Sequence, residues 1–335
     1  MKHRSRTLAV LATALAFTLP QLSAEKIDLA RVTPVPDAQA VPLQDFFRPP
    51  LFTSPQINPS GTHIAALVTA GTDEYRLLIY DMNKSTLESL GGTGDKDIFG
   101  FRWLTDKRLL FQMSSQKYYN LGMFAVETGN LNHPYPLLQF VGARLISIPQ
   151  DTPEFPVVWM SYDAADTEQD LGPATVNTIT RVGAFIDLHD AGVRHDDFID
   201  VRDSNERHVQ KTLPALRLKD AITSGYLADK TGTLAFGFSS SGGYTSLHYL
   251  EKGEWKKSPV NLEDVDIYAA GNAAGEVLTL GPGEPGQPSV LRMADVRTGT
   301  PGPVLFQDKG YDFDGEIYRD PVTRDIVGLM YDRAG

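Results

Sequence analysis

Cysteine is absent from this 335-residue chain. The absence excludes thiol nucleophiles, disulfide bonds and thiolate ligands for a metal. Clusters of basic residues are also missing after residue 6, and the formal net charge is −11. Proteins that bind nucleic acid or anionic membrane surfaces need lysine and arginine gathered on one face. We therefore expect no nucleic-acid partner and no binding to an anionic membrane surface.

A long hydrophobic run is missing as well. The apolar segment at residues 8–19 is shorter than the about 20 residues that cross a bilayer. It follows the basic residues Lys2, Arg4 and Arg6, and it precedes the small residues Ser23 and Ala24. This order predicts a signal peptide at residues 1–24, with a buried helix or a retained anchor as the alternative. We expect a periplasmic or secreted protein whose mature chain has no membrane span.

Amphipathic helices are not indicated, because no segment shows a clear apolar stripe with helical spacing. Residues 25–44 are polar and interrupted by proline, which predicts a linker. From there on, turn motifs of Asn, Asp, Gly and Pro precede short apolar strands. These motifs begin at residues 58, 106, 151, 229, 272 and 320. Such residues favour tight turns because they preset or tolerate the required backbone angles.

A second series of short strands follows the first, each ending in a polar turn. These strands are expected at residues 77–81, 123–126, 184–188, 247–250 and 292–296. The repeat length of about 40 to 50 residues with four strands per repeat is typical of a β-propeller. One step, from residue 151 to 229, is longer, and we interpret it as one blade with an acidic insertion around residues 163–170.

The sequence therefore predicts an all-β fold with a β-propeller over residues 45–335. It has five full four-stranded blades. A truncated sixth blade has strands near residues 315–319 and 325–331. Because a propeller closes its ring to protect strand edges, we expect the second strand of the sixth blade to have an open edge.

Two segments have more specific sequence patterns than the repeat itself. Residues 98–111 contain Phe99, Phe101 and Trp103 at alternating positions, which we expect on one face of a strand between two blades. Residues 52–68 place an Asn-Pro-Ser-Gly turn before a strand. Both segments resemble the N-terminal β-propeller of prolyl oligopeptidase-family serine peptidases of the dipeptidyl and acylaminoacyl peptidase type.

The resemblance implies a function and a missing part. In that family, a seven- or eight-bladed propeller caps an α/β-hydrolase domain, which carries the catalytic Ser, Asp and His. This sequence stops at Gly335 inside a blade, so none of the triad can be assigned to it, and we expect the chain to be inactive alone. The expected partners are this hydrolase domain and, through it, a peptide substrate whose access the propeller gates.

Two sequence motifs with catalytic or ligand-binding composition fail on spacing, and a third glycine- and proline-rich segment is a turn motif. Residues 237–243 contain three serines between glycines, but no register places glycine two positions before and after a serine, so we interpret them as a hairpin turn. Residues 91–96 lack the glycine and hydroxyl residue that must flank the lysine of a phosphate loop, so we interpret them as a linker. Residues 281–288 are interpreted as a hairpin connection.

A histidine and aspartate cluster is the remaining candidate. It comprises His189, Asp190, His195, Asp196, Asp197 and Asp200. These residue types bind several divalent metals, but neighbours on an extended chain point to opposite faces, so we favour a solvated acidic loop. We accordingly expect no catalytic residue, no cofactor and no metal site. Two alternatives stay open: a stand-alone periplasmic propeller that binds a partner, as TolB-type propellers do, and a propeller hydrolase with its own metal.

Overall fold

Alternating side chains build the strands of this protein. In the strand Arg76–Asp81, residues Leu77, Ile79 and Asp81 are buried while the residues between them are partly exposed. This period of two is the geometry of a pleated strand with one buried face. The computed structural model describes residues 50–69, 74–91, 96–115, 120–161, 170–180 and 205–331. The predicted signal peptide and linker lie outside these residues.

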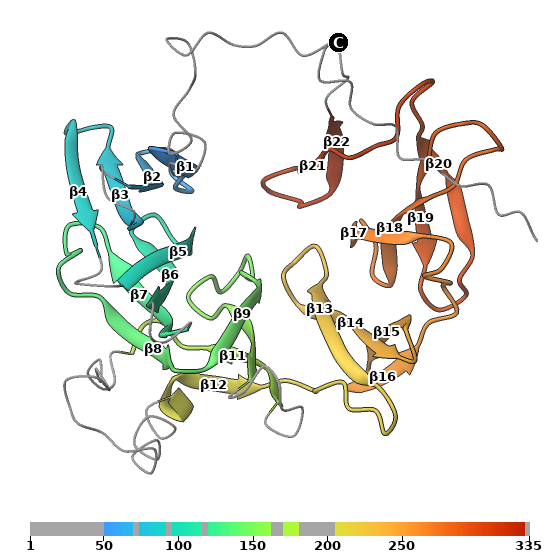
Figure 1. Cartoon of the computed structure of the whole chain (residues 1–335), viewed down its shortest axis with the longest axis horizontal. Coiled ribbons are helices and arrows are strands. Elements are labelled where there is room, and N and C mark those ends of the chain that lie inside the picture. The colour runs from blue at the N-terminus through green and yellow to red at the C-terminus, as the bar shows by residue number, and fades with distance from the viewer. Residues whose placement is uncertain are drawn as a thin grey trace, which may run out of the picture. The chain divides into compact units, whose positions relative to one another are not determined.

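Five consecutive four-stranded antiparallel sheets form blades 1 to 5, and a two-stranded sheet forms blade 6 (Figure 1). Blade 1 contains β1 (Phe52–Ile57), β2 (His63–Val68), β3 (Arg76–Asp81) and β4 (Thr86–Leu90). Blade 2 contains β5 (Lys96–Trp103), β6 (Arg108–Ser115), β7 (Gly122–Glu127) and β8 (Tyr135–Gln139). Blade 3 contains β9 (Gly142–Ser147), β10 (Val157–Ser161), β11 (Asp170–Val176) and β12 (Val209–Thr212).

The remaining blades repeat the same up-and-down order. Blade 4 contains β13 (Ile222–Ala228), β14 (Leu234–Ser241), β15 (Tyr244–Glu251) and β16 (Glu254–Lys257). Blade 5 contains β17 (Asp266–Ala270), β18 (Glu276–Gly281), β19 (Val290–Asp295) and β20 (Pro301–Phe306), and blade 6 contains β21 (Glu316–Arg319) and β22 (Ile326–Met330). A single helical turn at residues 205–208 precedes β12. This confirms the predicted propeller fold with five full blades and a two-stranded sixth.

Apolar clusters join most neighbouring blades. One cluster contains Leu77 of blade 1 and Phe111 of blade 2, and another contains Met123 of blade 2 and Val158 of blade 3. Further clusters join blade 4 to blade 5 around Phe236 and blade 5 to blade 6. Residues Pro49–Gly335 accordingly form one compact unit. Within the described residues, no helix is both long and apolar enough to cross a bilayer.

The predicted Asx turns have the hydrogen bonds that define them. Asn58 Oδ1 accepts from the backbone nitrogens of Thr62 and His63 at 2.8 and 2.9 Å. Asp229 Oδ1 accepts from Thr231 and Thr233 in the same way, at 2.9 and 3.0 Å. These side chains hold the turns that connect the first two strands of blades 1 and 4. The strand after each turn motif was therefore predicted correctly.

The third strand of blade 3 is not where the sequence pattern placed it. We expected it at residues 184–188, which lie outside the described residues, but β11 occupies that position in the sheet. In β11, Pro173 pairs with Trp159 of β10, next to Gly172. A Gly-Pro pair is unfavourable in a strand interior, which is why the sequence did not indicate a strand there. The long step from residue 151 to 229 is nevertheless one blade, as predicted.

Phe99 does not share a face with Phe101 and Trp103, which corrects a second prediction. Phe101 and Trp103 are buried, but Phe99 is 49% exposed, and Ile98 takes the buried position instead. The pairing of β5 with β6 shifts register between Ile98 and Gly100. A bulge of one residue reverses the side-chain alternation on either side of it, and glycine next to it facilitates the change.

The turn between β21 and β22 contacts two blades far away in the sequence. Gln150 of blade 3 donates to the Val322 carbonyl at 2.9 Å, and Lys230 of blade 4 pairs with Asp325 at 2.5 Å. The side-chain hydrogen bond from Lys230 lowers the pKa of Asp325, with the charge of Lys230 acting in the same direction. Blade 6 is thus tied to blades 3 and 4 through its turn as well as to blade 5 through its core.

Candidate functional site

A cleft of about 850 Å³ lies between blades 2 and 3. Its volume is within the range of about 300–1,000 Å³ that small ligands and short peptide segments occupy. Residues of β5, β6, β7 and β9 form its walls, together with residues that precede β7 and β9. The polar and charged residues along it are Arg102, Gln112, Asn120 and Arg144.

Two amide side chains fix the geometry of the cleft. Gln112 Nε2 on β6 donates to the Ala143 carbonyl at 2.6 Å. Asn120 Nδ2 donates to the Val141 carbonyl at 3.1 Å, while Asn120 Oδ1 accepts from the Gly122 nitrogen at 2.8 Å. Both amides therefore connect blade 2 to the backbone at the start of β9. These bonds hold the two walls of the cleft in one relative position.

The cleft is cationic although the protein is acidic. Its lining contains Arg102 and Arg144 but no aspartate or glutamate. The ion pairs found between described residues include neither arginine. Arg144 lies over the ring of Trp159 at 5.5 Å, a cation–π contact that orients the guanidinium without neutralising its charge. Trp159 in turn packs against blade 4, so the Arg144 guanidinium lies on the face of blade 3 that is turned to blade 4.

Trp159 is the first ring of an aromatic chain that leads away from the cleft. Tyr226 of blade 4 meets Trp159 edge-on at 5.4 Å, and Trp255 lies 5.9 Å from Tyr226. The Tyr226 hydroxyl accepts from the Leu216 nitrogen at 2.9 Å. These contacts fix the ring on which Arg144 rests, so the position of Arg144 depends on packing between blades 3 and 4.

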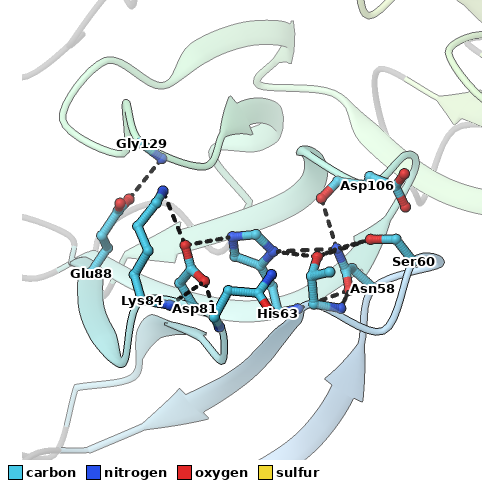
Figure 2. A network of polar contacts seen from close by, with 10 residues as sticks. Asn58, Ser60, His63, Asp81, Lys84, Glu88, Asp106 and Gly129 are labelled. Carbon is cyan, nitrogen blue, oxygen red and sulfur yellow. Dashed lines mark hydrogen bonds and ion pairs between the residues drawn. The ribbon is translucent and has the colours of Figure 1, made fainter.

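A hydroxyl, an imidazole and a carboxylate contact one another in sequence at the turn of blade 1. Thr62 Oγ1 lies 2.9 Å from His63 Nδ1. His63 Nε2 lies 3.6 Å from Asp81 Oδ2 (Figure 2). The Asp81 carboxylate also pairs with Lys84 Nζ at 3.2 Å. Hydrogen bonds from the turn, the one from the Lys84 nitrogen above all, lower the pKa of Asp81.

This network has a structural role. Thr62 Oγ1 also contacts Asn58 Nδ2 and Ser60 Oγ, at 3.0 and 2.9 Å, so its hydrogen-bonding capacity is already used within the turn. Asn58 Nδ2 further donates to the Asp106 carbonyl of blade 2 at 2.9 Å (Figure 2). A nucleophile needs a hydroxyl directed at a substrate, with donors placed for the developing oxyanion. The network instead joins the turns of blades 1 and 2.

The serine-rich segment at residues 237–243 is a hairpin, as predicted. Strand β14 continues to Ser241, and the turn at Gly242 and Gly243 has φ values of +59° and +86°. Two successive positive φ values define the turn type that suits a two-residue hairpin, and glycine adopts them without strain. The nucleophile elbow of a hydrolase would need a strand followed by a helix, and here β15 follows.

Sequence reasoning missed a contact in this hairpin between Ser239 and His248. Ser239 Oγ lies 2.9 Å from His248 Nε2, and both residues are buried, with exposures of 4% and 5%. Burial lowers the pKa of His248, and the nearby positive charge of Lys257 lowers it further. A catalytic pair would need access for a substrate and a carboxylate to orient the imidazole. The neutral, enclosed His248 fits a structural role.

The lowered pKa of His248 predicts a loss of stability in mild acid. The unfolded chain binds a proton near the ordinary pKa of about 6.5, whereas the folded chain binds it only at lower pH. The free energy of unfolding should therefore decrease as the pH falls below about 6.5, until the folded-state pKa is passed. We expect His248→Gln to weaken this dependence. Urea unfolding of both proteins between neutral pH and about pH 5 tests it; equal pH slopes would contradict the assignment.

The other predicted motifs either lie outside the described residues or connect strands. The cluster from His189 to Asp200 lies outside the described residues. Gly91 follows β4 and Lys96 begins β5, so residues 91–96 connect blade 1 to blade 2 as predicted, and the hairpin connection predicted at residues 281–288 lies between β18 and β19. Within the part of the chain that the structure describes, no three His, Cys, Asp or Glu residues are grouped as metal ligands.

The cleft was not found from the sequence because its walls come from separate blades. Residues of β5 and β6 meet β9 only after both blades have folded. One signal was available: Arg102 stands between the buried Phe101 and Trp103, so its side chain must leave the core. The second arginine, on β9, carried no comparable signal.

Comparisons with known proteins show a similarity in fold. No protein-family model matches the chain, and no curated protein matches it in sequence. A solved prolyl endopeptidase is 9% identical with a TM-score of 0.49, covering 85% of this chain and 43% of its own. The β-propeller domain of the Trilobed protease from Pyrococcus furiosus is 13% identical with a TM-score of 0.41, covering 79% of this chain and 75% of its own.

A putative dipeptidyl aminopeptidase IV from Bacteroides ovatus is 11% identical with a TM-score of 0.43, covering 76% of this chain and 39% of its own. This chain thus spans less than half the length of two of these three structures. With identities of 9–13% and TM-scores below 0.5, the matches carry no argument about activity.

Proposed function

We propose that this chain is the non-catalytic propeller part of an exported serine-type peptidase, where it gates access and positions peptide substrates. One observation carries the proposal. Residues 98–111, whose pattern resembles the propeller of prolyl oligopeptidase-family enzymes, form parts of β5 and β6 and thereby one wall of the cleft. The segment with the family resemblance therefore also lines a cleft.

Hydrolysis is assigned to an α/β-hydrolase domain outside this sequence. In such a domain, a serine attacks the peptide carbonyl, a histidine accepts the serine proton, and an aspartate orients the histidine. Two arrangements among the described residues contain part of this set, Ser239 with His248 and Thr62 with His63 and Asp81. The first is enclosed and the second is committed to a turn, which supports a non-catalytic role. The predicted signal peptide at residues 1–24 supports a periplasmic or secreted location.

Peptide capture without cleavage tests the proposal. The purified mature chain, residues 25–335, is mixed with a library of short synthetic peptides, and bound peptides are recovered and analysed by mass spectrometry. We expect a subset of peptides to be retained at full length. Retention of none would contradict a role in substrate positioning, and recovery of truncated peptides would contradict the non-catalytic assignment.

A stand-alone binding module is the second candidate, and it is favoured by the completeness of the blades. Each of blades 1 to 5 is built from one continuous chain segment. The two candidates differ in what they predict for blade 6. Within the described residues, β22 pairs only with β21, and Val327 and Met330 are 66% and 48% exposed. An apolar strand with an unpaired edge favours pairing with another chain.

We therefore expect residues 25–335 to self-associate in a concentration-dependent way. Val327→Lys should reduce the association, because a charge on an edge strand opposes edge-to-edge pairing. Size-exclusion chromatography with light scattering over a range of concentrations measures both proteins. A stable monomer at every concentration would favour the stand-alone module over the peptidase propeller.

A further inference from the structure

We propose that copies of this chain associate head to tail, with the far face of blade 6 of one copy packed on the far face of blade 1 of the next. The far face of blade 1 is the sheet face turned away from blade 2, and the far face of blade 6 is the one turned away from blade 5. The inference goes beyond the proposed role in a peptidase. It assigns a pair of surfaces to the self-association that the edge of β22 alone leads us to expect.

An apolar row crosses all four strands of blade 1 on its far face. Strand pairing places four residues side by side from β1 to β4: Ile57, Ile64, Tyr80 and Leu87. Cross-strand partners have their side chains on one face of a sheet. The adjacent residues Ala65 and Ile79 belong to the cluster shared with blade 2, so the row lies on the opposite face. Ile57 and Leu87, at the two ends of the row, are 63% and 62% exposed and are therefore accessible to another molecule.

A cation with an unsatisfied donor lies on the same face. Arg76 precedes Leu77, which belongs to the cluster shared with blade 2, so the two side chains point to opposite faces. The Arg76 side chain crosses Gly91, where a Cβ would lie 3.1 Å from Arg76 Cδ. Its Nε atom is buried without a hydrogen-bond partner, and the ion pairs found between described residues do not include Arg76. Since a buried donor without an acceptor is unfavourable, a carboxylate from a docked molecule would stabilise this face.

The far face of blade 6 is also apolar and carries the opposite charge. Ile317 and Leu329 pack against blade 5, which leaves Tyr318 and Met330 on the far face, where they are 50% and 48% exposed. The Tyr318 hydroxyl donates to the Met330 sulfur at 3.4 Å. Glu316 is exposed and pairs across the sheet with Met330, so its carboxylate belongs to the same face. The ion pairs found between described residues do not include Glu316 either, and it can pair with Arg76 of another copy.

Contacts between successive blades show how the two far faces fit together. A blade has one face for the preceding blade and the opposite face for the following one: Leu109 of blade 2 packs toward blade 1, and its neighbour Leu110 packs toward blade 3. The far face of blade 1 is of the first kind and that of blade 6 is of the second, so they are the two kinds that meet at each such contact.

Contacts within one chain assign these faces to separate copies. Gln150 of blade 3 and Lys230 of blade 4 hold the turn of blade 6, and blade 5 holds its apolar face. The exposures of Leu87 and Tyr318 show that the two far faces of one chain do not cover each other. A second copy can cover both, and a head-to-tail contact of this kind lets each copy bind two others.

Mixing two variants, each with one altered face, tests the inference. Leu87→Lys places a charge on the far face of blade 1, and Tyr318→Lys places one on the far face of blade 6. Each variant of the mature chain, residues 25–335, should associate at least about tenfold more weakly than the wild type. An equal mixture should form a one-to-one complex, because each variant keeps the face that the other has lost. Analytical ultracentrifugation over a range of concentrations measures the masses.

Charge reversal tests the pairing of Arg76 with Glu316. Arg76→Glu and Glu316→Arg should each weaken the association about tenfold, because like charges then face each other across the contact. The double variant should regain most of the wild-type association, since it reverses the pair without removing it. Leu218→Lys is the matched control, because Leu218 is 41% exposed in the connection between blades 3 and 4 and belongs to neither far face. Circular dichroism of every variant checks the fold.

Three results would overturn the inference, each for a different reason. If Leu87→Lys associates as strongly as the wild type, copies pair through the edge of β22, to which Leu87 does not belong. If the mixture of Leu87→Lys and Tyr318→Lys stays monomeric, the two far faces do not meet. If the wild-type chain is a monomer at every concentration, another protein or another segment of the same chain covers the far face of blade 1. None of these results affects peptide capture, so the library experiment tests the proposed function separately.

Discussion

Replacing Phe101 with alanine is expected to lower the free energy of unfolding by about 3–5 kcal/mol. Phe101 is 3% exposed and belongs to the apolar cluster that joins blades 1 and 2. Removing the ring takes away its burial and leaves a cavity that the two sheets cannot close, because strands joined by ladder hydrogen bonds move little. Urea unfolding followed by tryptophan fluorescence measures the change, since Trp103 is part of the same cluster.

The matched control is Phe99→Ala, two residues earlier on the same strand. Its ring is 49% exposed, so we expect a change of no more than about 0.5 kcal/mol. The pair of variants tests the register shift in β5 directly. If both substitutions lower the free energy of unfolding by the same amount, the side chains of β5 would alternate regularly. Phe99 would then face the core, as the sequence pattern predicted.

Gly122→Ala is expected to lower the free energy of unfolding by more than about 4 kcal/mol. Gly122 has a φ of +110°, and a Cβ there would overlap the Leu138 carbonyl of the neighbouring strand. Two backbone segments joined by ladder hydrogen bonds cannot separate to make room without breaking those bonds. We expect an unfolded or strongly destabilised protein, measured by circular dichroism and urea unfolding.

Gly129→Ala separates the effect of space from that of backbone angle. Gly129 also has a positive φ, of +76°, but no atom lies within 4 Å of where its Cβ would be. The free energy of unfolding should then decrease only by the energy of the left-handed backbone conformation, about 1–2 kcal/mol. If Gly122→Ala and Gly129→Ala lower the free energy of unfolding equally, the close approach of Leu138 would not be the reason why position 122 requires glycine.

The repeat could be predicted because its signals are local. A side chain such as that of Asn58 or Asp229 closes a turn with backbone groups two to five residues away, so the sequence alone identifies the turn and the strand after it. Strand alternation then identifies buried positions. The fold class and number of blades follow from counting these units.

The errors came from features that only the assembled sheet decides. The bulge at Phe99 depends on how β5 pairs with β6, and nothing in the alternation of Phe99, Phe101 and Trp103 reveals it. Strand β11 contains a Gly-Pro pair, which has a low β-strand propensity. It nevertheless pairs with β10 and β12 within blade 3. In both cases, tertiary pairing outweighs a local preference.

The candidate site was the least predictable feature. Arg102 and Arg144 are separated by one whole blade in the sequence, and neither forms a motif with its neighbours. The cleft depends on the hydrogen bonds of the Gln112 and Asn120 amides, which hold blade 2 against β9. A cleft made by the packing of two repeats has no signature within either repeat.

Reaction with a fluorophosphonate probe tests the central claim most directly, because such probes label activated serines covalently. The mature chain, residues 25–335, is incubated with the probe beside a known serine hydrolase, and intact-mass spectrometry counts the label. We expect no stoichiometric labelling, in line with the enclosed Ser239 and the absence of a substrate-accessible triad among the described residues. Stoichiometric labelling of any serine in this chain would show that it is itself a serine hydrolase and would contradict the account.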